Sequence, residues 1–123
     1  MNLKVVSPIF GFEDIKEIEF EKVDDFFSSL SSNDISFTIL DPRKVRDYQI
    51  EIPSSYEALL DIQDGDEIDF YVIMILQNPI ENSFVNFAAP IIINKTKNRL
   101  AQVALDEHKY PNYALSESIS NYL

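Results

Sequence analysis

The sequence lacks cysteine and tryptophan, and it contains two glycines and one histidine. Without cysteine the chain has no disulfide, no thiolate nucleophile and no cysteine metal site. Gly11 and Gly65 are too few for a phosphate-binding P-loop or a dinucleotide-binding fingerprint. His108 lies alone among charged residues, whereas a zinc site needs several ligands and a catalytic triad needs an oriented imidazole. We therefore expect no enzyme activity, no cofactor and no metal.

Basic residues are also scarce, since 10 Lys and Arg face 21 Asp and Glu, for a net charge of −11. This charge repels phosphate, so it disfavours direct nucleic-acid binding and suits a basic protein partner. An acidic composition can also serve only to keep the protein soluble, and charge alone does not separate the two explanations. The chain has no apolar run near the ~20 residues that span a bilayer, and its first residues do not resemble a signal peptide. We expect a cytoplasmic protein that does not enter membranes.

The longest apolar run lies at residues 68–76, within the stretch IDFYVIMILQNPIENSFVNFAAPIIIN. Phe70, Val72, Met74 and Leu76 share one face of an extended strand, and Tyr71, Ile73 and Ile75 share the other. Side chains alternate across a strand, so a strand that is apolar on both faces is covered on both. This pattern predicts a central strand around which the rest of the chain folds.

Alternating apolar and polar residues predict further strands, separated by turn residues, around Leu3 and Val5 and at 15–23, 35–40, 48–52, 84–94 and 100–105. Asp41-Pro42 indicates a helical turn, and the capping-box sequence at 54–57 indicates a short helix. We predict a mainly β fold, a small antiparallel β-barrel or sandwich-like single domain over residues 1–123 with one or two short helices. Residues 110–123 are expected to be a less ordered or short helical tail.

Acidic residues offer two further hypotheses. The turn at 61–67 fails as an EF-hand loop, because its fifth position is Gly65 and its twelfth is Val72. Pairs of carboxylates, such as Glu67 with Asp69, would support a small hydrolase only inside a cleft. A carboxylate-pair hydrolase and a small-ligand-binding β-barrel remain alternatives to a protein-binding function.

Several separated segments together resemble one protein family. They are the loop SPIFGFE at 7–13, the strand end FTILDP at 37–42, the segment NFAAPIIIN at 86–94, the strand QVAL at 102–105 and the pair YP at 110–111. Each motif is short, but their order and spacing cover nearly the whole chain. The sequence resembles the bacterial flagellar assembly factor FliW family.

This resemblance implies a non-enzymatic β-barrel that is monomeric when free and has two protein partners. Family members bind flagellin and, when free of it, sequester the RNA-binding translational repressor CsrA, which permits flagellin translation. The candidate partner-binding residues combine loop aromatics, an acidic strand entry and two asparagines that flank Pro90: Phe10, Phe12, Glu67, Asp69, Tyr71, Asn86 and Asn94. The two asparagines also have a structural interpretation, in which they satisfy exposed groups at a strand edge.

Overall fold

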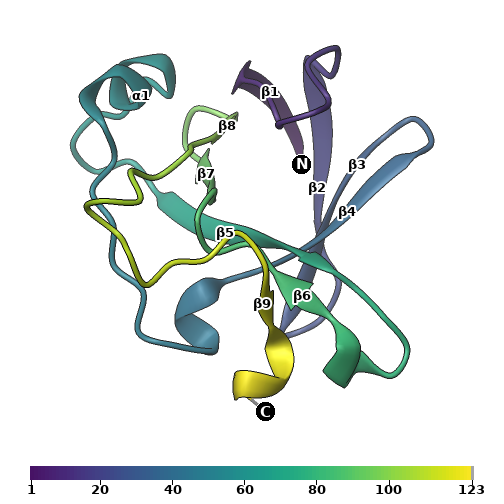
Figure 1. The fold of residues 1–123 in the computed structure, drawn as a ribbon. Helices are drawn as coiled ribbons and strands as arrows, with labels where there is room; N and C mark the ends of the chain where they lie inside the picture. Colours follow the sequence, from purple (N-terminus) through teal and green to yellow (C-terminus); the bar gives the residue numbers. More distant parts are fainter. Residues whose placement is uncertain (123) are drawn as a thin grey trace.

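Seven strands close into a barrel in the computed structural model, which describes residues 1–122 (Figure 1). Their order around the ring is β1 (Asn2–Ser7), β2 (Glu17–Lys22), β3 (Phe27–Ser32), β4 (Ile35–Leu40), β5 (Ile68–Ile75), β7 (Ile91–Asn94) and β8 (Arg99–Gln102). Strand β1 pairs with β8 in parallel, and the other neighbours in the ring are antiparallel. The predicted mainly β fold is confirmed, as a barrel.

Strand β5 joins the barrel to a small extension of the sheet. Its first half, Ile68 to Tyr71, pairs with β7, and its second half pairs with β4 on one side. On the other side Met74 and Ile75 pair with β6 (Phe84–Val85), which in turn pairs with β9 (Glu117–Ser118). The central strand predicted from the apolar run is therefore confirmed, and it is the strand with the most partners.

Branched apolar side chains fill the barrel. The most deeply buried of them, each 0–1% exposed, are Leu3, Ile9, Ile18, Leu30, Ile39, Ile91, Ile93 and Leu100. Burial of each such side chain contributes roughly 1.5–3 kcal/mol to folding. A second core lies on the other face of β5, where Val72 and Met74 pack with Phe87. Side chains thus occupy the interior in which a small-ligand carrier would hold its ligand.

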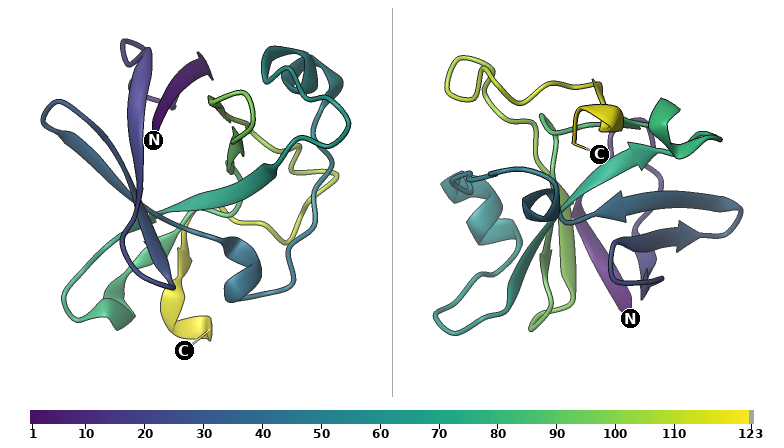
Figure 2. Two further views of the ribbon diagram at one scale, coloured as in Figure 1. Left: turned by 180° about the vertical axis from the view of Figure 1, so that it is seen from behind. Right: turned by 90° about the horizontal axis from the view of Figure 1, so that it is seen from below.

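The helical elements are short. Helix α1 (Ser54–Leu59) lies on the opposite side of the molecule from the β3–β4 hairpin (Figures 1 and 2). The helix is as predicted but its capping box is wrong: Pro53 is the N-cap residue and makes no side-chain cap, and Ser54 is already helical. The predicted turn after Asp41 is confirmed as a 3-10 helix, Pro42–Lys44, capped by Asp41. No helix within residues 1–122 is long and apolar enough to cross a membrane.

The predicted strand at residues 48–52 is wrong, because the segment is not part of the sheet. Its alternation is nevertheless real, since Tyr48 is buried and Gln49 is exposed. Tyrosine hydroxyls take the place of a neighbouring strand: the Gln49 N–H donates to Tyr113 Oη over 2.9 Å, and the Glu51 N–H donates to Tyr110 Oη over 2.8 Å. Both tyrosines belong to the segment that follows β8.

The end of the chain folds back over the second core. Strand β9 and a 3-10 turn, Ile119–Tyr122, form where the apolar spacing suggested one side of a helix. Ile119 is fully buried, whereas Leu115 is 70% exposed. Figure 1 shows this yellow segment beside β6, in agreement with the pairing of β6 with β9. The segment therefore forms part of the protein surface next to β6.

Candidate functional site

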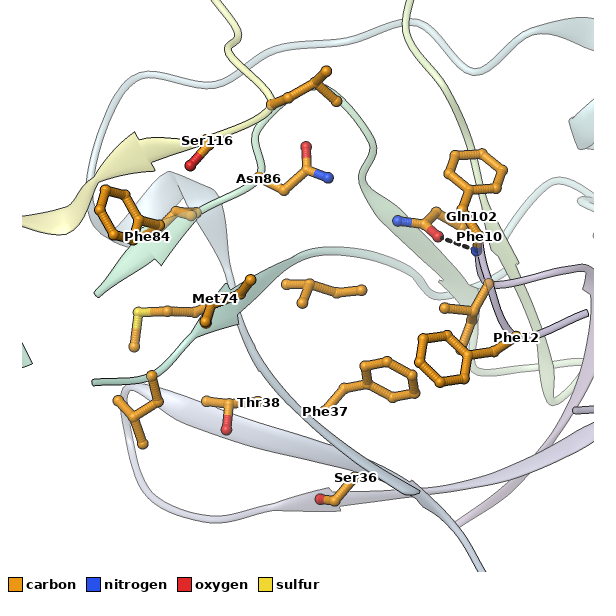
Figure 3. Close-up of a pocket in the computed structure, with 16 residues that line it drawn as sticks. Phe10, Phe12, Ser36, Phe37, Thr38, Met74, Phe84, Asn86, Gln102 and Ser116 are labelled. Carbon is orange, nitrogen blue, oxygen red and sulfur yellow. Dashed lines mark hydrogen bonds between the residues drawn. The ribbon is translucent and has the colours of Figure 1, made fainter. Parts of the chain in front are cut away.

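A surface groove of about 570 Å³ lies between the loop after β1, strands β4, β5 and β6, and the residues before β9 (Figure 3). Its 16 lining residues are Ile9, Phe10, Phe12, Ser36, Phe37, Thr38, Ile73, Met74, Ile75, Leu76, Phe84, Val85, Asn86, Gln102, Leu115 and Ser116. None of these side chains is charged, although 25% of the chain is charged. The groove is therefore a distinctly apolar surface on an acidic protein.

The aromatic loop after β1 forms one wall of the groove. Ile9 is buried and anchors the loop, and the Phe12 N–H donates to the Ile9 carbonyl over 2.8 Å. Between the two aromatics Gly11 has φ +88°, a conformation that glycine adopts without the strain of a Cβ. This turn leaves Phe10 47% and Phe12 37% exposed, and the Phe12 ring makes an edge contact with Phe37 across the groove.

Two amide side chains fix the backbone on which this wall rests. Gln102 is 3% exposed; its Oε1 accepts from the Phe10 N–H over 2.8 Å, and its Nε2 donates to the Ala89 carbonyl over 3.0 Å. Asn86 Oδ1 accepts from the N–H groups of Ala88 and Ala89 over 3.1 and 3.2 Å. Figure 3 shows the Gln102–Phe10 bond at the edge of the groove. Asn86 therefore bonds the backbone of the turn that follows β6.

The opposite wall is formed by four exposed apolar residues, and for two of them, Ile75 and Leu76, the prediction that the central strand is covered on both faces is wrong. Ile75 is 62% exposed, Leu76 52%, Phe84 45% and Leu115 70%. Together with the two loop aromatics they are six of the nine exposed large apolar residues within residues 1–122. Exposed apolar residues that gather on one surface mark interaction sites, whereas scattered ones need no explanation. The position of Ile75 and Leu76 at the end of the apolar run, before the Asn78-Pro79 turn, was the signal available in the sequence.

The acidic strand entry lies outside the groove lining. Glu67 is exposed, whereas Asp69 forms an ion pair with Lys95, with 2.6 Å between Oδ2 and Nζ. The Tyr71 ring packs 5.4 Å from the Phe20 ring, and its burial raises the pKa of the Tyr71 hydroxyl. Of the three predicted residues here, Glu67 thus presents the carboxylate that is most available to a partner.

Asn94 is fully buried and lies apart from Asn86. Its Nδ2 donates to the Leu60 carbonyl over 3.0 Å and to Asp66 Oδ2 over 2.9 Å. This bond is the largest cause of a lowered pKa at Asp66, and Lys97 lies 3.1 Å from the same carboxylate oxygen. Asn94 therefore joins β7 to the end of α1 from inside the fold.

Carboxylates meet in one small surface pocket of about 230 Å³, which Asp24, Asp25 and Asp41 line together with Lys22, Lys44 and Lys95. Within residues 1–122 no three His, Cys, Asp or Glu side chains are placed to hold a metal ion. Glu17 and Glu19, the carboxylate pair on β2, are exposed on its outer face. The lone histidine, His108, is exposed as well. Glu17, Glu19 and His108 lie outside this pocket.

The fold and the groove define a small β-barrel domain with an uncharged apolar surface of the kind that binds other proteins. Residues 1–115 match the family model described as FliW protein, and the chain belongs to this family. It is 44% identical over 127 aligned residues to the flagellar assembly factor FliW of Campylobacter lari, with 100% of this chain and 97% of the relative covered. It is 43% identical to the flagellar assembly factor FliW of Sulfurimonas denitrificans, with 100% of this chain and 98% of that protein covered.

A solved structure has the same fold. The crystal structure of a flagellar assembly factor FliW aligns with a TM-score of 0.84 at 24% identity, covering 96% of this chain and 84% of that one. The likeness supports the barrel topology. In this chain the loop at Gly11 and the Asn86 and Gln102 amides shape one side of the groove.

Proposed function

We propose that this protein binds flagellin through the groove and, when free of flagellin, sequesters the translational repressor CsrA. Membership of a family of flagellar assembly factors supports a role in flagellar biogenesis. The proposal places the protein in the cytoplasm, where translation occurs, as a monomer when it is unbound. It requires two kinds of surface, one for an assembly subunit and one for a basic RNA-binding protein.

The observation that carries the flagellin half of the proposal is the uncharged groove. Phe10 and Phe12 lie on one side of it and Phe84 lies on the other (Figure 3). Leu76 also lines it. Apolar side chains that stay exposed in the free protein gain free energy when a partner removes them from water, at about 25 cal/mol per Å². A subunit that assembles through apolar surfaces offers the complementary surface.

The net charge supports the CsrA half. At −11 the chain attracts a basic RNA-binding protein and repels the RNA phosphates that compete for it. Glu67 is the exposed carboxylate of the predicted acidic entry, whereas the charge of Asp69 is balanced by Lys95. We therefore assign steering of the repressor to Glu67 rather than to Asp69.

The groove is tested by a matched pair of leucine variants. Leu76 in the groove is 52% exposed, and Leu59 on α1 is 44% exposed. Leu76→Ser removes a side chain whose burial by flagellin contributes about 1–2 kcal/mol, so we expect affinity to fall roughly 5–30-fold in calorimetric titration with purified flagellin. Leu59→Ser should leave affinity within about twofold. Equal losses in both variants, or no binding by the unmodified protein, would contradict the assignment.

The charge assignment is tested with a second pair. Glu67→Lys and Glu107→Lys change the net charge equally, from −11 to −9, and both carboxylates are exposed. We expect Glu67→Lys to slow association with CsrA more than Glu107→Lys does, at low ionic strength, and the difference to vanish in high salt. Stopped-flow association rates measure this. Identical rates for the two variants would show that net charge alone, and not this surface, steers the partner.

A further inference from the structure

Strand β4 has an open edge inside the groove. It pairs with β3 along all of its residues, from the Phe27–Leu40 pair to the Ser32–Ile35 pair. Its pairing with β5 stops at the Thr38–Met74 pair, so the first half of β4 has no neighbour on that side. The two strands diverge beyond this pair, and residues from both of them line the groove.

The register shows which backbone groups the open edge presents. The Ile73 carbonyl accepts from the Asn86 N–H over 3.0 Å and so points away from β4. Backbone groups alternate along a strand, so those of Met74 point toward β4 and meet Thr38. By the same alternation, the N–H and carbonyl of Ser36 point into the space between the two strands, beyond the last pair. Ser36 itself is exposed.

The side chains around this edge are arranged for an added strand. Phe37 and Ile73 pack against the barrel core and line the groove from below, and Ser36 faces solvent. A chain paired with Ser36 would place alternate side chains over Phe37 and Ile73, between the walls formed by Phe12 and Phe84, and the others toward water. The groove thus fits an extended segment with small apolar residues at every second position.

The charged residues that neighbour the lining residues along the chain, called the rim here, indicate the ends of this segment. The charged residues within two positions of any lining residue are all acidic: Glu13, Asp14, Asp34 and Glu117. Glu117 is paired with Arg46, 3.5 Å away, and the other three are exposed. An apolar segment with lysine or arginine at its ends is therefore complementary to the groove and its rim.

We propose that the groove binds its protein partner by β-strand addition, with an extended, alternately apolar segment flanked by basic residues pairing with the open edge of β4 at Ser36. Backbone pairing of this kind gives affinity that depends little on the exact side chains, and the apolar positions give selectivity. The inference rests on the proposed function in one respect, that the ligand of the groove is a protein segment.

The test uses the whole protein and a short peptide in which valine and threonine alternate between pairs of lysines. We expect the peptide to shift the amide resonances of Ser36 and Leu76 in ¹⁵N-labelled protein, and a version with methylated backbone nitrogens to bind about tenfold more weakly. A version with glutamates in place of the lysines should also bind more weakly. Shifts confined to another surface, or equal binding of the three peptides, would overturn the proposal.

Two variants of Ser36 make the same test on the protein side. Ser36→Pro removes the backbone N–H that points into the groove. Ser36 is at a strand edge, where a sheet tolerates proline. Ser36→Ala keeps the N–H. We expect Ser36→Pro to lose about tenfold in peptide affinity and Ser36→Ala to stay within about twofold. Equal affinities would overturn strand addition. If Ser36→Pro does not fold, the backbone-methylated peptide decides the question with the unmodified protein.

Measurements of flagellin binding by the same variants test strand addition and the proposed function separately. If Leu76→Ser loses flagellin while Ser36→Pro binds it as Ser36→Ala does, the groove binds flagellin by another mode and strand addition is wrong. If the unmodified protein does not bind flagellin but the peptide pairs with β4, the strand-addition site is supported and the proposed partner is wrong.

Discussion

Removing the Gln102 side chain tests whether one buried amide holds the aromatic wall of the groove in place. Gln102→Leu keeps most of the volume but removes both hydrogen bonds, to the Phe10 N–H and to the Ala89 carbonyl. Ala89 is 2% exposed, so its carbonyl is left without water, at about 1–3 kcal/mol. The Phe10 N–H is partly buried, so leaving it without an acceptor costs less free energy than leaving the Ala89 carbonyl without a donor. We expect a total loss of about 2–4 kcal/mol.

This loss is large relative to the roughly 5–15 kcal/mol that stabilises a typical domain. At about 4 °C per kcal/mol it lowers the melting temperature by about 8–16 °C. Urea unfolding followed by circular dichroism measures the free energy. The exposed Gln49 offers a matched control, since Gln49→Leu makes the same chemical change and should cost no more than about 0.5 kcal/mol.

Amide exchange connects this stability change to the groove. In Gln102→Leu the Phe10 amide should exchange faster than in the unmodified protein, because its acceptor is gone. Flagellin affinity should fall with it, because the aromatic wall is no longer fixed. A variant that loses less than about 0.5 kcal/mol, or whose Phe10 amide exchanges at the original rate, would refute the role given to Gln102.

Two further predictions concern the acid response and the end of the chain. Hydrogen bonds from Asn94, from the Gln63 N–H and from Lys97 lower the pKa of Asp66 in the folded state. The Asp66 carboxylate therefore stabilises the fold fully above the ordinary carboxyl pKa of about 3.9, and this stabilisation is lost as pH falls through the lower folded pKa. Asp66→Asn should therefore flatten the decline of unfolding free energy below about pH 4 in urea titrations, and an unchanged slope would contradict this. The Arg46 guanidinium lies 4.9 and 5.9 Å from the ring centroids of Tyr113 and Tyr122. Arg46→Lys keeps the charge but loses the planar stacking, so it should cost about 1–2 kcal/mol and speed exchange of the amides at 112–122, whereas full retention of protection would exclude this anchoring role.

The strand at the centre of the fold was predictable because its signal is local. Val72 and Met74 on one face and Ile73 on the other are apolar in the sequence and covered in the structure. The segment at 48–52 shows the limit of the same signal. Alternation records that every second side chain is buried, but it does not say whether the backbone partner is a strand or, as here, a pair of tyrosine hydroxyls.

The groove was predictable in part for a similar reason. Phe10 and Phe12 stand out because aromatic residues flank a glycine in a loop, and Asn86 stands out because it opens the segment NFAAPIIIN that resembles the FliW family. Leu76 and Leu115 look like core residues, and their exposure follows from where β4 stops pairing with β5 and from how the chain end returns beside β6. Both are long-range pairings that a local pattern does not contain.

The footprint of bound flagellin on this protein shows whether flagellin binds in the groove. Hydrogen–deuterium exchange of the purified complex, compared with the free protein, reports which backbone segments flagellin covers. We expect added protection at residues 9–12, 35–38, 75–76, 84–86 and 115–116, which line the groove or lie beside it, and none at α1 (Ser54–Leu59). Protection that leaves these segments unchanged and falls on another face of the barrel would contradict this expectation.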